Sequence, residues 1–198
     1  MKFGPHVTVR FARVTEAEER LARDLYDSSM RDPLTRAYNR RYLTNRLPAE
    51  IAYFLRHGGS LSVITFDFDH CKKLNDRYGH ALGDAVLTGS AALIGTTLRS
   101  EGVLARVGGE EFVIVLRGIG RESAIKCAER VRHAVEKAEF SLEGAVARAT
   151  ISAGVATSDE LTLDPAGASL LKLADTRLYE AKAAGRNRVI GPPPLGMP

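Results

Sequence analysis

Two adjacent glycines, Gly108 and Gly109, lie between strongly apolar stretches near the middle of this 198-residue chain. A Gly-Gly pair suits a two-residue turn with positive φ at both positions, so the segment predicts a β-hairpin over about 103–116. Glu110 and Glu111 follow the turn directly. Because adjacent residues of a strand point to opposite faces of a sheet, an ordinary hairpin does not account for both acids. Glycines also let a bulky ligand approach the backbone, so the turn is a candidate binding site.

A second acidic segment follows an apolar stretch at 61–68, which predicts a strand. Asp67 and Asp69 stand two residues apart and therefore share a face. Carboxylates are costly inside a sheet unless they are paired or metal-bound, and beside the acidic hairpin they would suit Mg²⁺, which also binds substrate phosphates. We assign Asp67 to the metal and Asp69 to the N-cap of the next helix. Lys72 and the first N–H groups of that helix would hold phosphate.

The rest of the chain alternates between helical and strand periodicity, without an internal repeat. The pattern predicts helices at about 39–56, 70–77, 83–99, 121–138 and 166–184, and further strands at about 147–156 and 187–190. Mixed helices and strands, with a hairpin in the middle, indicate an α/β sandwich whose sheet is partly antiparallel.

Both ends of the chain differ from the body. Residues 1–14 alternate apolar and polar side chains and predict one strand, which cannot be stable alone and would be the remnant of an upstream domain. Residues 15–30 predict a helix with acids in its first turn. This helix is either packed on its own domain or a coiled-coil signalling linker. Residues 191–198 are rich in proline, carry no packing signal and are expected to be disordered.

Composition narrows the class of protein. The formal net charge is +4, and the basic residues are scattered, which argues against nucleic acid as a partner. Two cysteines without metal-type spacing fit a reduced, cytoplasmic setting better than a disulfide framework. No apolar run approaches the roughly 20 residues of a membrane span, and no signal peptide opens the chain. We therefore expect a cytoplasmic location without direct membrane contact.

Four motifs in the right order make the segment 31–190 resemble the diguanylate cyclase domains of the GGDEF family. Gly108 to Phe112 is similar to the family signature, in a GGEEF form. The other similar segments are Asp32 to Arg41, Phe66 to Leu87, and Leu178 to Asn187. The resemblance implies a palm-like βαββαβ core, a mixed sheet flanked by helices, and an extra β-hairpin that carries the signature.

The resemblance also implies a reaction, in which two GTP molecules condense into cyclic di-GMP with loss of two pyrophosphates. Mg²⁺ or Mn²⁺, two ions per GTP, would be held by Asp67, Glu110 and the carbonyl of Phe68. Glu111 would complete the metal site or help to activate the 3′-hydroxyl. One domain holds one GTP, so a homodimer is implied, controlled through the 15–30 helix by an upstream sensory domain.

Further roles come from the same resemblance. Asn75 and Asp84 would read the guanine edge, and Asp84 favours GTP over ATP. The triphosphate would lie against the glycine turn, held by three basic side chains, Lys72, Lys182 and Arg186. Residues 1–14 resemble the final strand of a forkhead-associated domain, as in some fused cyclases.

The chain departs from the family at the inhibitory product site. The usual Arg-x-x-Asp is Arg99-Ser100-Glu101-Gly102 here, so the arginine is kept and the aspartate is lost. Arg130 occupies the position of the second product-binding arginine. The two arginines either form a residual product site, with weak or absent feedback inhibition, or are solvated helix surface.

Three other functions compete with this enzyme. The domain would instead be a catalytically weak receptor for a nucleotide or cyclic di-GMP, a relaxed cyclase that also accepts ATP, or a dimerisation module built on the first helix. A receptor usually loses the signature acids, which this chain keeps. A dimerisation module leaves the acidic clusters unexplained.

Overall fold

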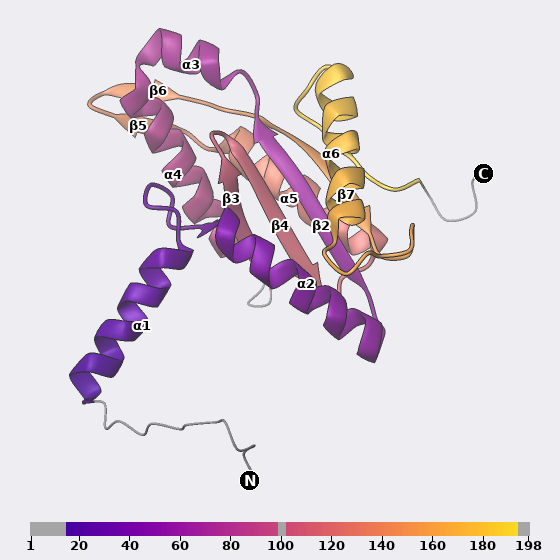
Figure 1. Ribbon diagram of the computed structural model, residues 1–198. Coiled ribbons are helices and arrows are strands. Elements are labelled where there is room, and N and C mark those ends of the chain that lie inside the picture. The colour runs from indigo at the N-terminus through magenta and orange to yellow at the C-terminus, as the bar shows by residue number, and fades with distance from the viewer. Residues whose placement is uncertain (1–14, 99–101, 194–198) are drawn as a thin grey trace.

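The computed structural model describes residues 15–98 and 102–193 (Figure 1). The predicted strand at 1–14, Arg99 and residues 194–198 lie outside this part. Its centre is a six-stranded sheet in the order β1-β3-β4-β2-β7-β8. The strands are β1 (Tyr38–Asn39), β2 (Leu61–Phe68), β3 (Val103–Gly108), β4 (Glu111–Arg117), β7 (Ile151–Thr157) and β8 (Val189–Ile190). The two outer pairs are parallel and the inner pairs antiparallel, which confirms the predicted mixed sheet.

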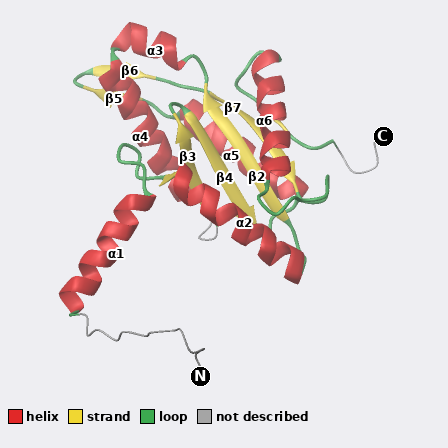
Figure 2. Ribbon diagram, viewed as in Figure 1, coloured by secondary structure: helices red, strands yellow, loops and turns green. Residues whose placement is uncertain are grey.

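Helices cover both faces of this sheet (Figures 1 and 2). On one face α2 (Arg40–His57) and α6 (Ala168–Ala183) pack on residues such as Val63 and Val113. On the other face α4 (His80–Thr97) and α5 (Arg121–Lys137) pack around Phe66, Phe68 and Phe112. The short α3 (Cys71–Tyr78) follows the end of β2.

Strand β2 has a neighbour on each side and helices over each face, and all eight of its residues are buried. This explains its nearly continuous apolar sequence. Since side chains alternate along a strand, Asp67 lies on the face of Val63 and Thr65, toward α2 and α6. Its position therefore follows from the two-residue period of the strand.

The elements of the structure differ from the sequence-based expectation in several places. The glycine hairpin is formed by β3 and β4, which are integral strands of the sheet, while a separate hairpin of β5 (Phe140–Leu142) and β6 (Ala145–Ala147) was not predicted. Helix α4 begins at His80, directly after α3. The tail is not free of packing at its start, because Pro192 is buried and the carbonyl of Pro193 accepts a hydrogen bond from Arg121 at 2.6 Å.

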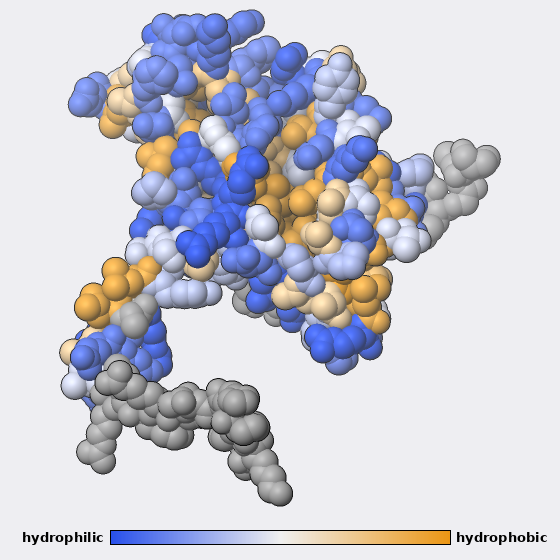
Figure 3. All heavy atoms as spheres, viewed as in Figure 1, coloured by the Kyte–Doolittle hydropathy of each residue, from blue (hydrophilic) through white to orange (hydrophobic). Residues whose placement is uncertain are grey.

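Helix α1 (Glu16–Met30) projects from the body (Figure 1). A capping box between Thr15 and Glu18 starts it. Leu21, Leu25 and Tyr26 are each about 60 % exposed, and Figure 3 shows an apolar patch on this helix. The predicted helix is thus present, and these side chains do not pack on the body. No helix in the described ranges has the length and apolar character needed to cross a membrane.

Gly154 sets the distance between β7 and α6. A Cβ atom added there would overlap the carbonyl oxygen of Ala174 and the amide nitrogen of Leu178, which are backbone atoms that cannot rotate away. We expect Gly154→Ala to lower the free energy of unfolding by about 1–3 kcal/mol. Urea unfolding measures it.

Gly95 in α4 is the matched control, because a Cβ atom there meets nothing within 4 Å. Gly95→Ala is expected to raise the free energy of unfolding by about 0.5–1 kcal/mol. Equal stability of the two variants would contradict this account of the β7–α6 contact.

Candidate active site

Asp67 is buried at the end of β2, with 6 % of its surface exposed. In the strand register it lies opposite Glu111 of β4. Its nearest cation is Lys182 of α6, whose Nζ is 2.9 Å from Oδ2. Burial raises the pKa of Asp67, and the charges of Glu110 and Glu111 raise it further, while the Lys182 ammonium opposes them. The site therefore holds more negative charge than one lysine offsets.

The glycine turn is held against the end of β2. The amide of Phe68 donates to the carbonyl of Glu110 at 3.4 Å. Arg106 donates two hydrogen bonds, of 2.7 and 2.9 Å, to the carbonyl of Gly109. The same guanidinium pairs with Asp32 at 2.9 Å, so the turn is anchored to the segment before α2.

The expected positive φ angles of this turn are not found at either Gly108 or Gly109. The register shifts between Arg106 and Gly108, and Gly108 pairs with Glu111, so the two-residue turn is formed by Gly109 and Glu110 and not by the two glycines. A Cβ atom at Gly109 would meet nothing within 4 Å. No positive φ requires either glycine, and the open space lies over Gly109, whereas the Glu111 and Arg40 side chains lie over Gly108. A ligand can therefore approach the backbone at Gly109.

The donor set at this end of β2 fits a hard divalent cation that is only partly ligated by protein. Over the described residues, no three acidic, histidine or cysteine side chains form a complete metal site. Mg²⁺ typically takes one or two carboxylates and completes its shell with water and substrate phosphates. A buried carboxylate crowded by two others suits that mode. Burial also raises the pKa of the neighbouring Cys71 thiol to about 12, so this cysteine is not an activated nucleophile.

Asn75 and Asp84, the residues assigned to guanine, are brought together by the turn between α3 and α4. A Cβ atom at Gly83 would overlap Oδ1 of Asn75, so the Asn75 side chain lies directly on α4 at Gly83, the residue before Asp84. Asp84 is exposed and available to a ligand. Lys72 is exposed in the first turn of α3, and no side chain caps that helix, which leaves its first N–H groups for an anion.

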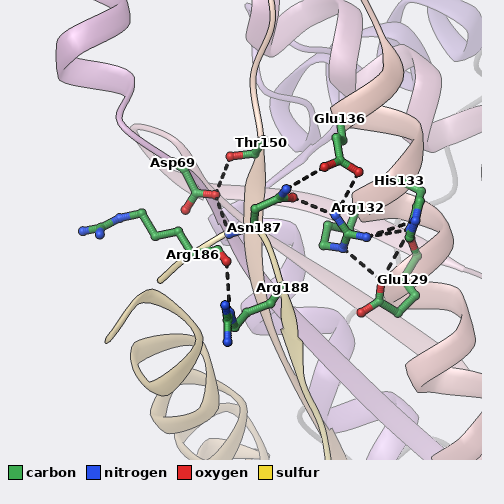
Figure 4. Close-up of polar contacts among 9 residues, drawn as sticks. All are labelled: Asp69, Glu129, Arg132, His133, Glu136, Thr150, Arg186, Asn187 and Arg188. Carbon is green, nitrogen blue, oxygen red and sulfur yellow. Dashed lines mark hydrogen bonds and ion pairs between the residues drawn. The ribbon is translucent and has the colours of Figure 1, made fainter. Parts of the chain in front are cut away.

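The N-cap assignment of Asp69 is wrong. The N-cap of α3 is His70, in a left-handed conformation and without a side-chain hydrogen bond. The Asp69 carboxylate instead accepts hydrogen bonds from the Thr150 hydroxyl at 2.7 Å and from the Asn187 amide at 3.1 Å (Figure 4). It also accepts one from the Ser152 hydroxyl at 2.7 Å. Asp69 points to β7 and to the turn after α6 because those donors converge there.

A cleft of about 580 Å³ lies between α2 and α6 and is lined by Glu111 and Lys182. Figure 3 shows apolar atoms between these helices. The cleft also contains Asp175, which the sequence reasoning missed. Burial and the charge of Glu111 raise the pKa of Asp175, and the Thr65 hydroxyl opposes this rise. The signal was available, because Asp175 precedes Lys182 by two helical turns and so shares its face.

At the suggested product site, Arg99 lies outside the described residues. Gly102 and Arg130 line one hollow of about 460 Å³, so the structure brings these two positions together. Arg130 donates to the carbonyl of Thr97 at 3.2 Å. Whether this hollow binds product stays a prediction.

Comparison with known proteins identifies the family. A family model described as "Diguanylate cyclase, GGDEF domain" matches residues 29–188. The chain belongs to the GGDEF family. It is 41% identical over 165 residues to the probable diguanylate cyclase DgcT of Escherichia coli. This alignment covers 81% of this chain and 35% of DgcT. The chain spans about a third or less of the curated relatives it matches most strongly.

Two solved structures of GGDEF proteins are similar in fold to this chain. Diguanylate cyclase SiaD of Pseudomonas aeruginosa, in complex with its activator SiaC, has a TM-score of 0.79 and 32% identity, over 88% of this chain and 66% of that one. The coiled coil and GGDEF domain of DgcB from Caulobacter crescentus, in complex with c-di-GMP, also has a TM-score of 0.79, with 27% identity over 88% of this chain and 91% of that one.

The raised pKa of Asp67 predicts that ionisation of this carboxyl group lowers the stability of the folded domain. A raised folded-state pKa means that the folded state loses stability as pH rises through that pKa. In metal-free buffer we expect Asp67→Asn to become progressively more stable, relative to the parent, from pH 4 to pH 7. Melting temperatures across this range measure the difference.

Asp164 supplies a control of opposite sign. Hydrogen bonds from the Ser169 hydroxyl and amide hold the pKa of Asp164 well below its usual range, so its stabilisation is present at neutral pH and lost in acid. Asp164→Asn should therefore lose stability relative to the parent as pH rises to about 4, the ordinary pKa of an aspartate, and change little above it, so melting temperatures are measured below pH 4 as well. The same trend in both variants would refute the account of Asp67.

Proposed function

We propose that this domain is a diguanylate cyclase, which condenses two GTP molecules into cyclic di-GMP and two pyrophosphates. The observation that carries the proposal is the buried Asp67, opposite Glu111 and beside an open glycine turn, in a GGDEF fold. A buried carboxylate with two further acids beside it is useful where a cation-bearing ligand offsets the negative charge.

In this proposal Asp67, Glu110 and the Phe68 carbonyl hold Mg²⁺ or Mn²⁺, two ions per GTP. These ions supply charge stabilisation at the attacking and leaving oxygens of phosphoryl transfer. Glu111 completes the metal site or accepts the proton of the ribose 3′-hydroxyl. Because Glu111 lies opposite Asp67 in the strand register, it can take either role without a rearrangement of β2 and β4.

The basic residues hold the triphosphate. Lys182 contacts Asp67 at 2.9 Å, so it can exchange this carboxylate for a phosphate oxygen when substrate enters. Lys72, exposed at the start of α3, and Arg186, exposed after α6, add positive charge from two other sides. The open space over Gly109 lets the substrate approach the hairpin backbone, beside the Glu111 and Arg40 side chains that lie over Gly108.

The reaction joins two substrates, and one domain is proposed to bind one. Two copies must then face each other, so the active form is a homodimer. The exposed apolar side chains of α1 are a suitable contact for a second copy and would transmit a signal from an upstream domain. Positioning of the two GTP molecules then supplies most of the remaining catalysis.

We favour the enzyme over a receptor for nucleotide or cyclic di-GMP. The signature acids Glu110 and Glu111 are kept, and Gly102 removes the carboxylate that would read guanine in a product site. A relaxed cyclase that also uses ATP is the second candidate, tested below at Asp84.

The decisive experiment incubates the chain with GTP and Mg²⁺ and separates the products by chromatography. Cyclic di-GMP is expected. Glu110→Ala should lower its rate of formation by about two orders of magnitude or more, as when an active site loses a charge-stabilising group. Glu122→Ala, which removes an exposed glutamate of α5, is the matched control and should keep the parent rate. Absence of cyclic di-GMP from the parent dimer would reject the function.

Asp84 tests base selection. A carboxylate accepts hydrogen bonds from two guanine N–H groups, and a bidentate contact of this kind discriminates by about 1–3 kcal/mol. Asp84→Ser should therefore raise the use of ATP relative to GTP by roughly 5- to 150-fold, the range to which that free energy corresponds. Competition between the two nucleotides measures the ratio, and an unchanged ratio would exclude Asp84 from base reading.

A further inference from the structure

The turn after α6 has an unusual backbone. Gly185, Arg186 and Asn187 follow one another with φ of +111°, +64° and +44°. Only glycine adopts such angles without cost, so two successive residues with side chains need support from their surroundings. The amide of Arg186 donates to the carbonyl of Ala181 at 3.0 Å, which joins the turn to the helix beside Lys182.

The support comes from Asn187, whose polar groups are held by neighbouring elements (Figure 4). Its side-chain nitrogen donates to Glu136 of α5 at 2.6 Å, and its side-chain oxygen accepts from Arg132 at 2.7 Å. Arg132 is itself buried and ion-paired with Glu129 and Glu136. Hydrogen bonds from Asn187 and Arg132 lower the pKa of Glu136, so the network is charged at neutral pH.

The backbone of Asn187 is held by Asp69, which is 7 % exposed. This carboxylate is oriented by two hydroxyl groups, those of Thr150, directly before β7, and Ser152, in β7. Asp69 follows Asp67 by two residues, so one short segment carries both the proposed metal carboxylate and the anchor of the turn. Asp69 therefore fixes the turn relative to the strand end from which Asp67 projects.

Arg186 is the side chain that this turn presents. It is exposed, and Figure 4 shows its guanidinium directed away from Asn187 and from the α5 side chains. In the described part of the chain its amide and carbonyl are hydrogen-bonded, whereas its guanidinium has no hydrogen bond or ion pair. The direction of this guanidinium thus depends on the backbone of the turn.

We propose that Asp69 and Asn187 are positioning residues, which hold the turn at Gly185–Asn187 so that Arg186 meets the substrate triphosphate. This inference rests on the proposed function. Neither residue touches the substrate; each acts through Arg186. A purely structural role would instead stabilise the fold without a specific effect on phosphate binding.

The test is a double-mutant cycle in the full chain, with Asn187→Gly, Arg186→Gln and the combination. Glycine accepts the positive φ at 187, so the substitution removes only the side-chain contacts. We expect Asn187→Gly to raise KM for GTP about tenfold, with kcat changed much less, because a displaced guanidinium weakens binding in both ground and transition states. In the Arg186→Gln background the same substitution should have little further effect, since both changes act through one group.

A second readout is independent of turnover. Calorimetry with inorganic triphosphate should show the same loss of affinity and the same lack of additivity. If the parent made no cyclic di-GMP, the proposed function would fail, while this measurement would still decide the positioning role. Asp69→Asn, which keeps the shape of the side chain but weakens its hydrogen-bond acceptance, should reproduce the effect if Asn187→Gly does not fold.

Glu160→Gln is the matched control. Glu160 is a half-buried residue whose carboxylate accepts hydrogen bonds from Thr157 and Arg177 at the opposite end of β7. The Glu160→Gln substitution should lower the melting temperature without changing KM for GTP or the affinity for inorganic triphosphate. The positioning role is overturned if Asn187→Gly leaves both quantities at parent values, or if its effect is fully additive with that of Arg186→Gln.

Discussion

The structure depends on keeping one carboxylate, Asp67, buried at the end of a strand that is covered on every side. A carboxylate in that position is costly unless it is paired. The pairing cation is Lys182, and it arrives from α6, which packs closely on β7 only because Gly154 has no side chain. The order of the strands, the close packing of the last helix and the charge at the site are therefore one linked arrangement.

That arrangement leaves an imbalance at Asp67, because Glu110 and Glu111 add negative charge beside it and Lys182 is the cation that pairs with it. A protein selected for stability alone would remove such crowding. A protein that binds a nucleotide with its cations benefits from it, since the unfavourable charge is relieved when the ligand binds. The cost in stability and the proposed activity thus have the same physical origin.

The two aspartates at the end of β2 are held differently. Asp67, inside the strand, is turned toward Lys182 of α6, whereas Asp69, directly after the strand, accepts hydrogen bonds from Thr150, Ser152 and the amide of Asn187. The first is left with an electrostatic need for a cation, and the second has none. Their spacing of two residues allows one strand end to provide a ligand and an anchor for the turn that carries Arg186.

Local sequence patterns were enough to predict β2, the glycine hairpin and the position of the acids that follow them, because the two-residue alternation of a strand and the effect of glycine on a turn are local. It also predicted the helices to within a few residues. The tertiary structure alone decided what Asp69 binds, since its donors Thr150 and Asn187 lie 81 and 118 residues away. The tertiary structure also decided the absence of positive φ at Gly108 and Gly109, which follows from the register of β3 on β4. Asp175 likewise becomes part of the site only when α6 packs over Thr65. Contacts between distant segments depend on packing, and no local pattern specifies them.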